Sequence, residues 1–213
     1  MGRVRVAGFA VSLDGFGAGS DQSLDQPLGF RGPELMSWFF PTKAFRAMTG
    51  QEGGSDGVDE SFANRAMEGF GAFILGRNMF GPIRNDWPDE DWKGWWGDNP
   101  PYHAPTFILT HHPRQSIVME GGTVFHFVTE GIQAALDQAR EAARGNDVKI
   151  GGGVATVRQY LEAGLIDELH IALSPVLLGR GEALFHDIDI SALGYRVIET
   201  TAGELATHVL IGR

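Results

Sequence analysis

The apolar residues of this chain fall into short runs that are separated by glycine, proline and acidic residues. Runs in which apolar and polar residues alternate, or in which β-branched residues fill a short apolar stretch, predict β-strands. The strands expected on this basis cover residues 3–11, 72–75, 105–110, 123–128, 148–150, 168–174, 195–201 and 205–211. The last two are joined across Ala202-Gly-Glu204, which predicts an antiparallel C-terminal hairpin.

Between the strands, apolar residues recur every three to four positions behind polar capping residues, a pattern that predicts helices. Pro33 begins a helical stretch that Pro41 interrupts, because proline lacks the N–H that a helix interior needs. The helices expected on this basis are 33–40, a continuation from a Thr42 cap to residue 48, a short helix capped by Ser61, a helix capped by Thr129 that ends at Gly145, and 154–163.

Strands and helices alternate through much of the chain. This alternation predicts an α/β fold of three layers, in which a sheet carries helices on both faces and the C-terminal hairpin forms an antiparallel edge. The chain has 213 residues, a length typical of one domain, and we expect residues 1–213 to form a single domain.

Composition excludes several classes of protein. The chain has no cysteine, which excludes disulfide frameworks, thiol nucleophiles and iron–sulfur clusters. Its seven histidines lack the spacing of a zinc site, so we expect no metal, and no G-x-S-x-G motif indicates an acyl-transfer triad. A net charge of −10 disfavours nucleic-acid binding, and no apolar run reaches the roughly 18 residues of a membrane span. We therefore expect a cytoplasmic protein without nucleic-acid or membrane partners.

The strongest chemical signal is the glycine run at 151–153, which lies between a predicted strand and a predicted helix. Glycines at such a turn let the backbone approach a ligand closely, and the N–H groups at the helix start favour an anion such as a phosphate. The dinucleotide-binding pattern G-x-G-x-x-G is not met, since Thr156 stands where its third glycine would be. The run is therefore either a phosphate cradle or a purely structural turn.

Two further strand ends carry groups that suit phosphate. Gly76 and Arg77 follow the strand 72–75, and a guanidinium makes forked contacts with phosphate oxygens. The strand 105–110 ends in Thr110-His-His112, with Arg114 two residues beyond. Ligands of α/β sheets bind at the carboxyl ends of the strands, so three such ends indicate a binding edge. Capped helices or solvated turns would explain each end equally well when it is taken alone.

Aromatic and acidic residues mark the remaining candidates. Asp14 precedes Gly15 after the first strand, and an Asp-Gly pair is in itself a common turn. Four tryptophans lie in the irregular segment 86–103, where they serve either packing or the binding of a flat heterocycle.

At this point several motifs match one family in order and spacing. They are Ser12-Leu-Asp-Gly15, Ile74-Leu-Gly-Arg-Asn-Met79, Phe107-Ile-Leu-Thr-His-His112, Ile150-Gly-Gly-Gly153, Leu165-Ile-Asp-Glu-Leu169 and Pro175-Val-Leu-Leu-Gly179. Together they resemble the dihydrofolate reductase-like reductase domain of riboflavin biosynthesis across nearly the whole chain. The chain is most similar to stand-alone bacterial members, which are often labelled deaminase-reductase proteins.

The resemblance implies an eight-stranded mixed sheet, NADPH bound across the strand ends, and a homodimer. It places Asp14 beside the nicotinamide and makes Glu34 the only carboxylate of the segment 34–41 that lies against the substrate, with Trp38 as a flat surface there. The cofactor-binding residues that it implies are Gly76 and Arg77 for the adenosine-side phosphates, Thr110, His111 and His112 near the 2′-phosphate, and Gly151, Gly152, Gly153, Val154, Ala155 and Thr156 for the pyrophosphate and nicotinamide end.

The departures from the family also bear on function. A deaminase half is absent, because its zinc site needs cysteines that the chain lacks. Folate reduction is not supported, since Glu34 lies near the helix start rather than along the first helix. The proton donor is Asp14, Glu34 or an ordered water, and the sequence does not choose among them. Carboxylates beside Trp38 favour a neutral or cationic heterocycle over a phosphorylated sugar as the substrate.

These observations lead to one expectation and two alternatives. We expect an NADPH-dependent reductase that transfers hydride to a small heterocyclic or sugar-linked molecule, with the cofactor supplying the chemistry and the protein the orientation. The first alternative is a non-catalytic NADP(H)-binding or sensor module. The second is a structural dimerisation domain, which would bind no nucleotide.

Overall fold

A nine-stranded sheet runs through the molecule, and a two-stranded sheet lies beside it. The computed structural model describes residues 2–81, 86–87 and 91–213, so part of the predicted irregular segment 86–103, residues 88–90, lies outside the described residues. The strands are β1 (Val4–Ser12), β2 (Phe16–Gly19), β3 (Phe70–Gly76), β4 (Pro105–Leu109), β5 (Ile117–Val118), β6 (Val124–Val128), β7 (Asp147–Gly152), β8 (Glu168–Ser174), β9 (Gly181–Ala183), β10 (Arg196–Ala202) and β11 (Thr207–Gly212).

The sheet is mixed, as predicted, in the order β10-β11-β8-β1-β7-β3-β4-β6-β5. The six central strands from β8 to β6 run parallel to one another. The C-terminal hairpin of β10 and β11 adds one antiparallel edge, and β5 adds the other. The described sheet therefore has one strand more than the eight that the resemblance implies, because the two-residue strand β5 pairs with the outer side of β6.

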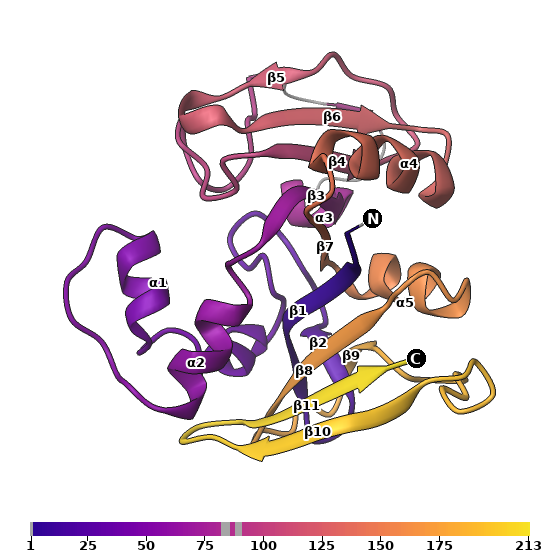
Figure 1. Cartoon of the computed structure of the whole chain (residues 1–213). Helices are drawn as coiled ribbons and strands as arrows, with labels where there is room; N and C mark the ends of the chain where they lie inside the picture. Colours follow the sequence, from indigo (N-terminus) through magenta and orange to yellow (C-terminus); the bar gives the residue numbers. More distant parts are fainter. Residues whose placement is uncertain (1, 82–85, 88–90) are drawn as a thin grey trace.

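Helices cover both faces of the sheet, as Figure 1 shows for α2 on one side of β1 and β8 and α5 on the other. The helices are η1 (Gly32–Met36), α1 (Lys43–Met48), α2 (Val58–Arg65), α3 (Arg77–Phe80), η2 (Glu120–Gly122), α4 (Ile132–Ala143) and α5 (Val154–Glu162). Both η elements are 3-10 helices. The three layers confirm the predicted α/β architecture.

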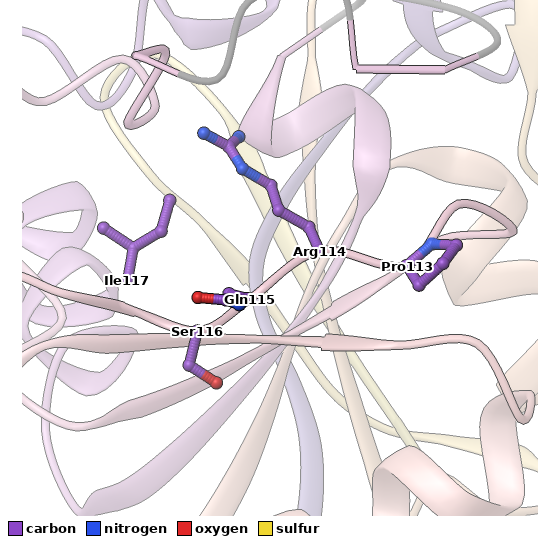
Figure 2. A pocket seen from close by; sticks show the side chains of 5 residues that line it. All are labelled: Pro113, Arg114, Gln115, Ser116 and Ile117. Atoms are coloured by element: carbon purple, nitrogen blue, oxygen red, sulfur yellow. The ribbon is translucent and has the colours of Figure 1, made fainter.

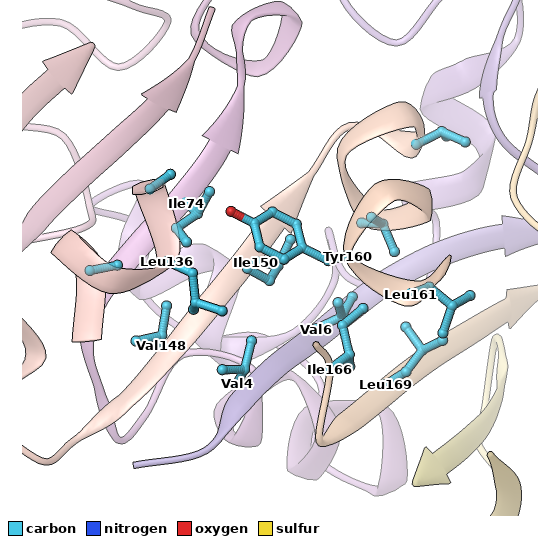
Figure 3. Packing of buried hydrophobic residues seen from close by; sticks show 14 of the residues in the cluster. Val4, Val6, Ile74, Leu136, Val148, Ile150, Tyr160, Leu161, Ile166 and Leu169 are labelled. Atoms are coloured by element: carbon cyan, nitrogen blue, oxygen red, sulfur yellow. The ribbon is translucent and has the colours of Figure 1, made fainter. Parts of the chain in front are cut away.

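The larger core lies between the sheet and the two helices α4 and α5 (Figure 3). Val148 and Ile150 of β7 point into it together with Leu136 of α4 and Tyr160 of α5. Strand alternation divides β8 between the two faces of the sheet. Leu169 belongs to this core, whereas Ala172 belongs to the second core beneath η1 and α2.

Local signals located the helices better than they located the helix ends. Thr42 caps α1 as predicted, since its side chain accepts a hydrogen bond from the Phe45 N–H at 3.2 Å. Ser61 does not cap a helix, because α2 begins three residues earlier, and Thr129 does not cap α4, whose N-cap is Gly131. The start of α2 is capped instead by the Glu204 carboxylate, which accepts from the Val58 N–H at 3.1 Å and the Asp59 N–H at 3.0 Å.

The stretch 33–40 also differs from the expectation. It forms the 3-10 helix η1 followed by turns, rather than one α-helix. The carbonyl of Leu35 there accepts a hydrogen bond from the Ser174 hydroxyl of β8 at 2.6 Å, so contact with the sheet helps to set its path.

Candidate functional site

Three strand ends that carry the predicted cofactor-binding residues lie side by side. Strand β3 pairs in parallel with β7 on one side and with β4 on the other. Leu75 is in register with Gly152, and Gly76 is in register with Leu109. The glycine run, the Gly76-Arg77 pair and the turn at 110–112 therefore meet at one edge of the sheet, as the sequence predicted. The cofactor role of these residues stays a prediction.

Close packing explains two glycines at this edge. A Cβ on Gly76 would collide with the Thr156 hydroxyl and lie 3.4 Å from the Gly152 carbonyl oxygen, so β3 and the start of α5 touch there. A Cβ on Gly151 would collide with the side chain of Leu75. Close packing therefore explains the glycine at position 151, and its role in binding a cofactor stays a prediction.

Gly152 and Gly153 have different surroundings from Gly151. Gly152 has φ +123°, a conformation that side chains disfavour, and a Cβ there would lie 3.0 Å from the Met79 sulfur and 3.1 Å from the Phe9 ring. Around Gly153, by contrast, no heavy atom lies within 4 Å of the position that a Cβ would take. The backbone at Gly153 therefore borders open space.

That open space lies at the N-terminus of α5. Gly153 is the N-cap residue and has no side chain to cap the helix, while the first turn consists of Val154, Ala155 and Thr156. The first N–H groups of a helix have no acceptor within the helix, and the helix dipole is positive at this end. Open space beside such donors fits a pyrophosphate, so the glycine run and α5 are compatible with the cofactor that the resemblance implies.

The turn after β4 is closed by its own hydroxyl group. The Thr110 Oγ1 accepts a hydrogen bond from the His112 N–H at 3.1 Å, which leaves His111 exposed to solvent. The Nδ1 of His112 lies 2.8 Å from the Asp86 carboxylate, and the Arg77 guanidinium donates to the Asp86 carbonyl at 3.2 Å. Arg77 and His112, both predicted to lie near phosphates, thus converge on residue 86.

Asp14 connects two strand ends. Its carboxylate accepts hydrogen bonds from the Ser12 hydroxyl at 2.6 Å, the Gly179 N–H at 2.6 Å and the Leu178 N–H at 3.1 Å. The Ser12 hydroxyl, followed by the backbone N–H groups, lowers the pKa of Asp14. Asp14 is therefore ionised at neutral pH and holds the segment after β8 against the end of β1, and its place beside the nicotinamide stays a prediction.

Glu34 is engaged with a neighbouring cation. Its carboxylate forms a forked pair with Arg31, with nitrogen–oxygen distances of 2.7 and 2.8 Å. The hydrogen bond from Arg31 lowers the pKa of Glu34, so this carboxyl group is also ionised. Arg31 further donates to the Leu177 carbonyl at 2.8 Å, which ties η1 to the same segment that Asp14 holds.

Trp38 requires a correction. Its side chain is only 1% exposed and packs in the second core, with its ring centroid 5.2 Å from that of His208. A ring enclosed by core residues presents no face to a ligand. The predicted flat substrate surface is therefore not formed by Trp38, because apolar packing under η1 takes the ring inward.

Sequence reasoning missed a depression that follows the turn at 110–112. It is open to solvent, encloses about 710 Å³, and is lined by Pro113, Arg114, Gln115, Ser116 and Ile117. Figure 2 shows the side chains of Arg114 and Ser116 extending in opposite directions from this segment. The Arg114 guanidinium lies 4.9 Å from the centre of the Trp87 ring. Only the charge of Arg114 gave a signal in the sequence, since residues 115–117 follow no motif.

The residues that the structure describes contain no group of three or more histidine, cysteine, aspartate or glutamate side chains arranged to hold a metal ion. Within the same residues, no helix has the length and apolar character that crossing a membrane requires.

Comparison with known sequences places this geometry in context. A sequence model of the RibD C-terminal domain matches residues 5–209. The uncharacterized protein YwjB of Bacillus subtilis (strain 168) is 34% identical over 62 residues, which are 29% of this chain and 35% of YwjB. The matched stretch thus spans about a third of that relative.

Solved structures resemble the whole chain. A putative riboflavin biosynthesis protein from Shewanella sp. PV-4 superimposes with a TM-score of 0.60 at 24% identity, covering 99% of this chain and 98% of that one. Dihydrofolate reductase from Enterococcus faecalis, solved in complex with NADP(H), superimposes with a TM-score of 0.52 at 14% identity, covering 99% and 96%. These similarities show that the fold is dihydrofolate reductase-like.

Proposed function

Since the chain belongs to the RibD C-terminal domain family, we propose that it is an NADPH-dependent reductase that transfers hydride to a small heterocyclic or sugar-linked substrate. The observation that carries the proposal is the edge at which β7, β3 and β4 end together, with open space in front of Gly153. The NADP(H) bound to the structurally similar dihydrofolate reductase supports the same cofactor.

Different residues at this edge would bind different parts of the cofactor. The start of α5 would hold the pyrophosphate through the backbone N–H groups of Gly153 to Ala155, since the Thr156 N–H donates to the Gly153 carbonyl at 3.1 Å. Arg77 and His112, which converge from neighbouring strand ends, would hold the phosphates of the adenosine end. When bound, the nicotinamide supplies the hydride.

The protein contributes orientation and a defined electrostatic environment. Phe9 and Met79 lie against Gly152 and provide an apolar wall beside the glycine run. The two candidate carboxyl groups, Asp14 and Glu34, are ionised and already accept hydrogen bonds, so neither carries a proton to donate. We therefore assign proton delivery to an ordered water.

The test is a matched pair of substitutions at Gly153. A Cβ added at Gly153 would extend into open space, and the φ of −66° at this residue suits any L-residue. Gly153→Asp and Gly153→Asn are therefore both expected to fold. The Asp variant places a negative charge where the pyrophosphate lies, whereas the Asn variant has the same shape without the charge. We expect NADPH affinity, measured by calorimetry, to fall at least about tenfold further for Asp than for Asn. Equal affinities would remove the glycine run from the cofactor site.

The engaged state of both carboxylates also favours the second candidate function, a non-catalytic NADP(H)-binding module. Such a module would bind NADPH with the same dependence on Gly153. It would leave the nicotinamide absorbance unchanged across a panel of heterocyclic and sugar-linked compounds, whereas the reductase would oxidise NADPH with at least one of them.

A further inference from the structure

We propose that Asp86 occupies the subsite for the adenosine-end phosphate, with Trp87 beside it in the place of the base, so that Asp86 competes with the 2′-phosphate of the nucleotide and sets how strongly the protein prefers NADPH over NADH. The inference rests on the proposed nucleotide binding and concerns residues of this chain that stand in for part of the ligand. Residues 86 and 87 contact Arg77, His112 and Arg114 at the strand ends.

Asp86 makes the contacts that a phosphate would make. Its carboxylate lies 2.8 Å from the Nδ1 of His112, and its carbonyl oxygen accepts a hydrogen bond from the Arg77 guanidinium at 3.2 Å. A carboxylate and a phosphate oxygen both carry negative charge and accept hydrogen bonds from the same donors. The carboxylate of Asp86 thus takes the acceptor position beside His112, and the backbone carbonyl of the same residue takes an acceptor position beside Arg77.

Trp87 makes the contacts that a nucleotide base would make. The Arg77 Cζ lies 3.9 Å from the centre of the Trp87 ring, and the Arg114 Cζ lies 4.9 Å from it. The indole N–H donates to the His112 carbonyl at 3.0 Å. A flat heterocycle stacked on a guanidinium, with one edge hydrogen-bonded to the backbone, is how proteins hold an adenine ring.

Exposure makes the Asp86 contact reversible. The Asp86 side chain is 97% exposed, and a polar contact this exposed is weak because water competes for both groups. A phosphate that carries more negative charge than a carboxylate therefore displaces it from His112. A ligand without that phosphate gains nothing from the exchange, so Asp86 acts on the difference between the two nucleotides.

Asp86→Asn tests this competition by removing the charge and keeping the shape. We expect the dissociation constant for NADPH, measured by calorimetry, to fall about three- to tenfold, and that for NADH to stay the same. The smaller pair 2′-AMP and 5′-AMP isolates the subsite, and 2′-AMP alone is expected to gain affinity. The matched control is Glu141→Gln on α4, which removes one exposed negative charge away from Arg77 and His112 and should change neither constant.

The outcomes separate the inference from the proposed function. An unchanged or lower preference for NADPH in Asp86→Asn, with both nucleotides still bound, overturns the role of Asp86 and leaves the reductase proposal standing. An equal gain in Glu141→Gln also overturns it, because the effect would then come from net charge. Failure of NADPH and of 2′-AMP to bind either the wild type or Asp86→Asn overturns the proposed function and this inference together.

Discussion

The Nε2 of His170 lies 3.0 Å from the Nδ1 of His208 in the interior of the second core. The Gly8 N–H donates to the Nδ1 of His170, which places the His170 proton on Nε2 and directs it at His208. His208 in turn donates from Nε2 to the buried carboxylate of Asp59 at 2.9 Å. The Gly8 N–H thus assigns the tautomer of both histidine rings. In this hydrogen-bonded series from Gly8 to Asp59, every ring nitrogen has a partner.

The buried pair of His170 and His208 predicts that the free energy of unfolding decreases in acid. Burial lowers the pKa of His170 to about 3 and also lowers the pKa of His208, although Asp59 opposes the second shift. Unfolded histidine titrates near 6.5, so below that pH the unfolded state binds protons that the folded state refuses. The free energy of unfolding should therefore fall as pH decreases from about 6.5 toward 4, by up to roughly 1.4 kcal/mol per pH unit for His170, and His208 adds a contribution of the same sign.

Urea unfolding across this pH range measures that slope. His170→Gln keeps a donor toward His208 but cannot titrate, so the variant should be less stable at pH 7 and show a slope smaller by about one proton. Parallel slopes in wild type and variant would mean that His170 is protonated in the folded protein.

Substitutions of Trp38 test whether its ring packs in the core or binds substrate. Because its ring is 1% exposed, Trp38→Ala should lower the free energy of unfolding by about 3–5 kcal/mol through the cavity that it leaves. Trp38→Phe, which fills most of that space, should cost less. In the folded variants, KM for any substrate that the enzyme reduces should stay unchanged. A KM that rises in Trp38→Phe without loss of stability would restore the substrate role.

Asp14 is expected to position the strand ends and not to donate a proton. A general acid contributes roughly a hundredfold or more to a rate, so loss of one would be conspicuous. We expect Asp14→Asn to keep kcat within about tenfold and to leave its pH profile unchanged, because the pKa of Asp14 already lies below its ordinary value. Glu34→Gln is the matched carboxylate control. Disappearance of one limb of the pH profile in either variant would identify a donor.

We propose a homodimer that pairs through the edge strand β10. Val197 and Ile198 on this strand are 55% and 52% exposed, and exposed apolar side chains on an edge strand favour pairing with a second copy. Light scattering should give about twice the 23.1 kDa of the chain, and Val197→Lys should return the mass to that of the monomer. Val118→Lys on β5, at the opposite edge and 79% exposed, is the control that should remain dimeric.

Much of the fold was predictable because its signals are local. Alternation located β8 and the hairpin, since strand side chains alternate between two faces whatever surrounds them. The glycine run could be placed between a strand and a helix because the patterns on its two sides are also local. Parallel strands end at one edge, so the meeting of Gly76, Thr110 and Gly152 followed from the α/β pattern.

The sequence by itself determined these elements and the family, whereas the tertiary structure decided what the polar side chains do. The Asp14 carboxylate accepts hydrogen bonds from N–H groups more than 160 residues away, and Glu204 caps a helix that begins 146 residues before it. Trp38 has a flat aromatic ring that would suit a ligand surface, but the ring lies in the core. Each of these roles depends on a partner that folding brings near, and no local pattern records the distance between two atoms that are remote along the chain.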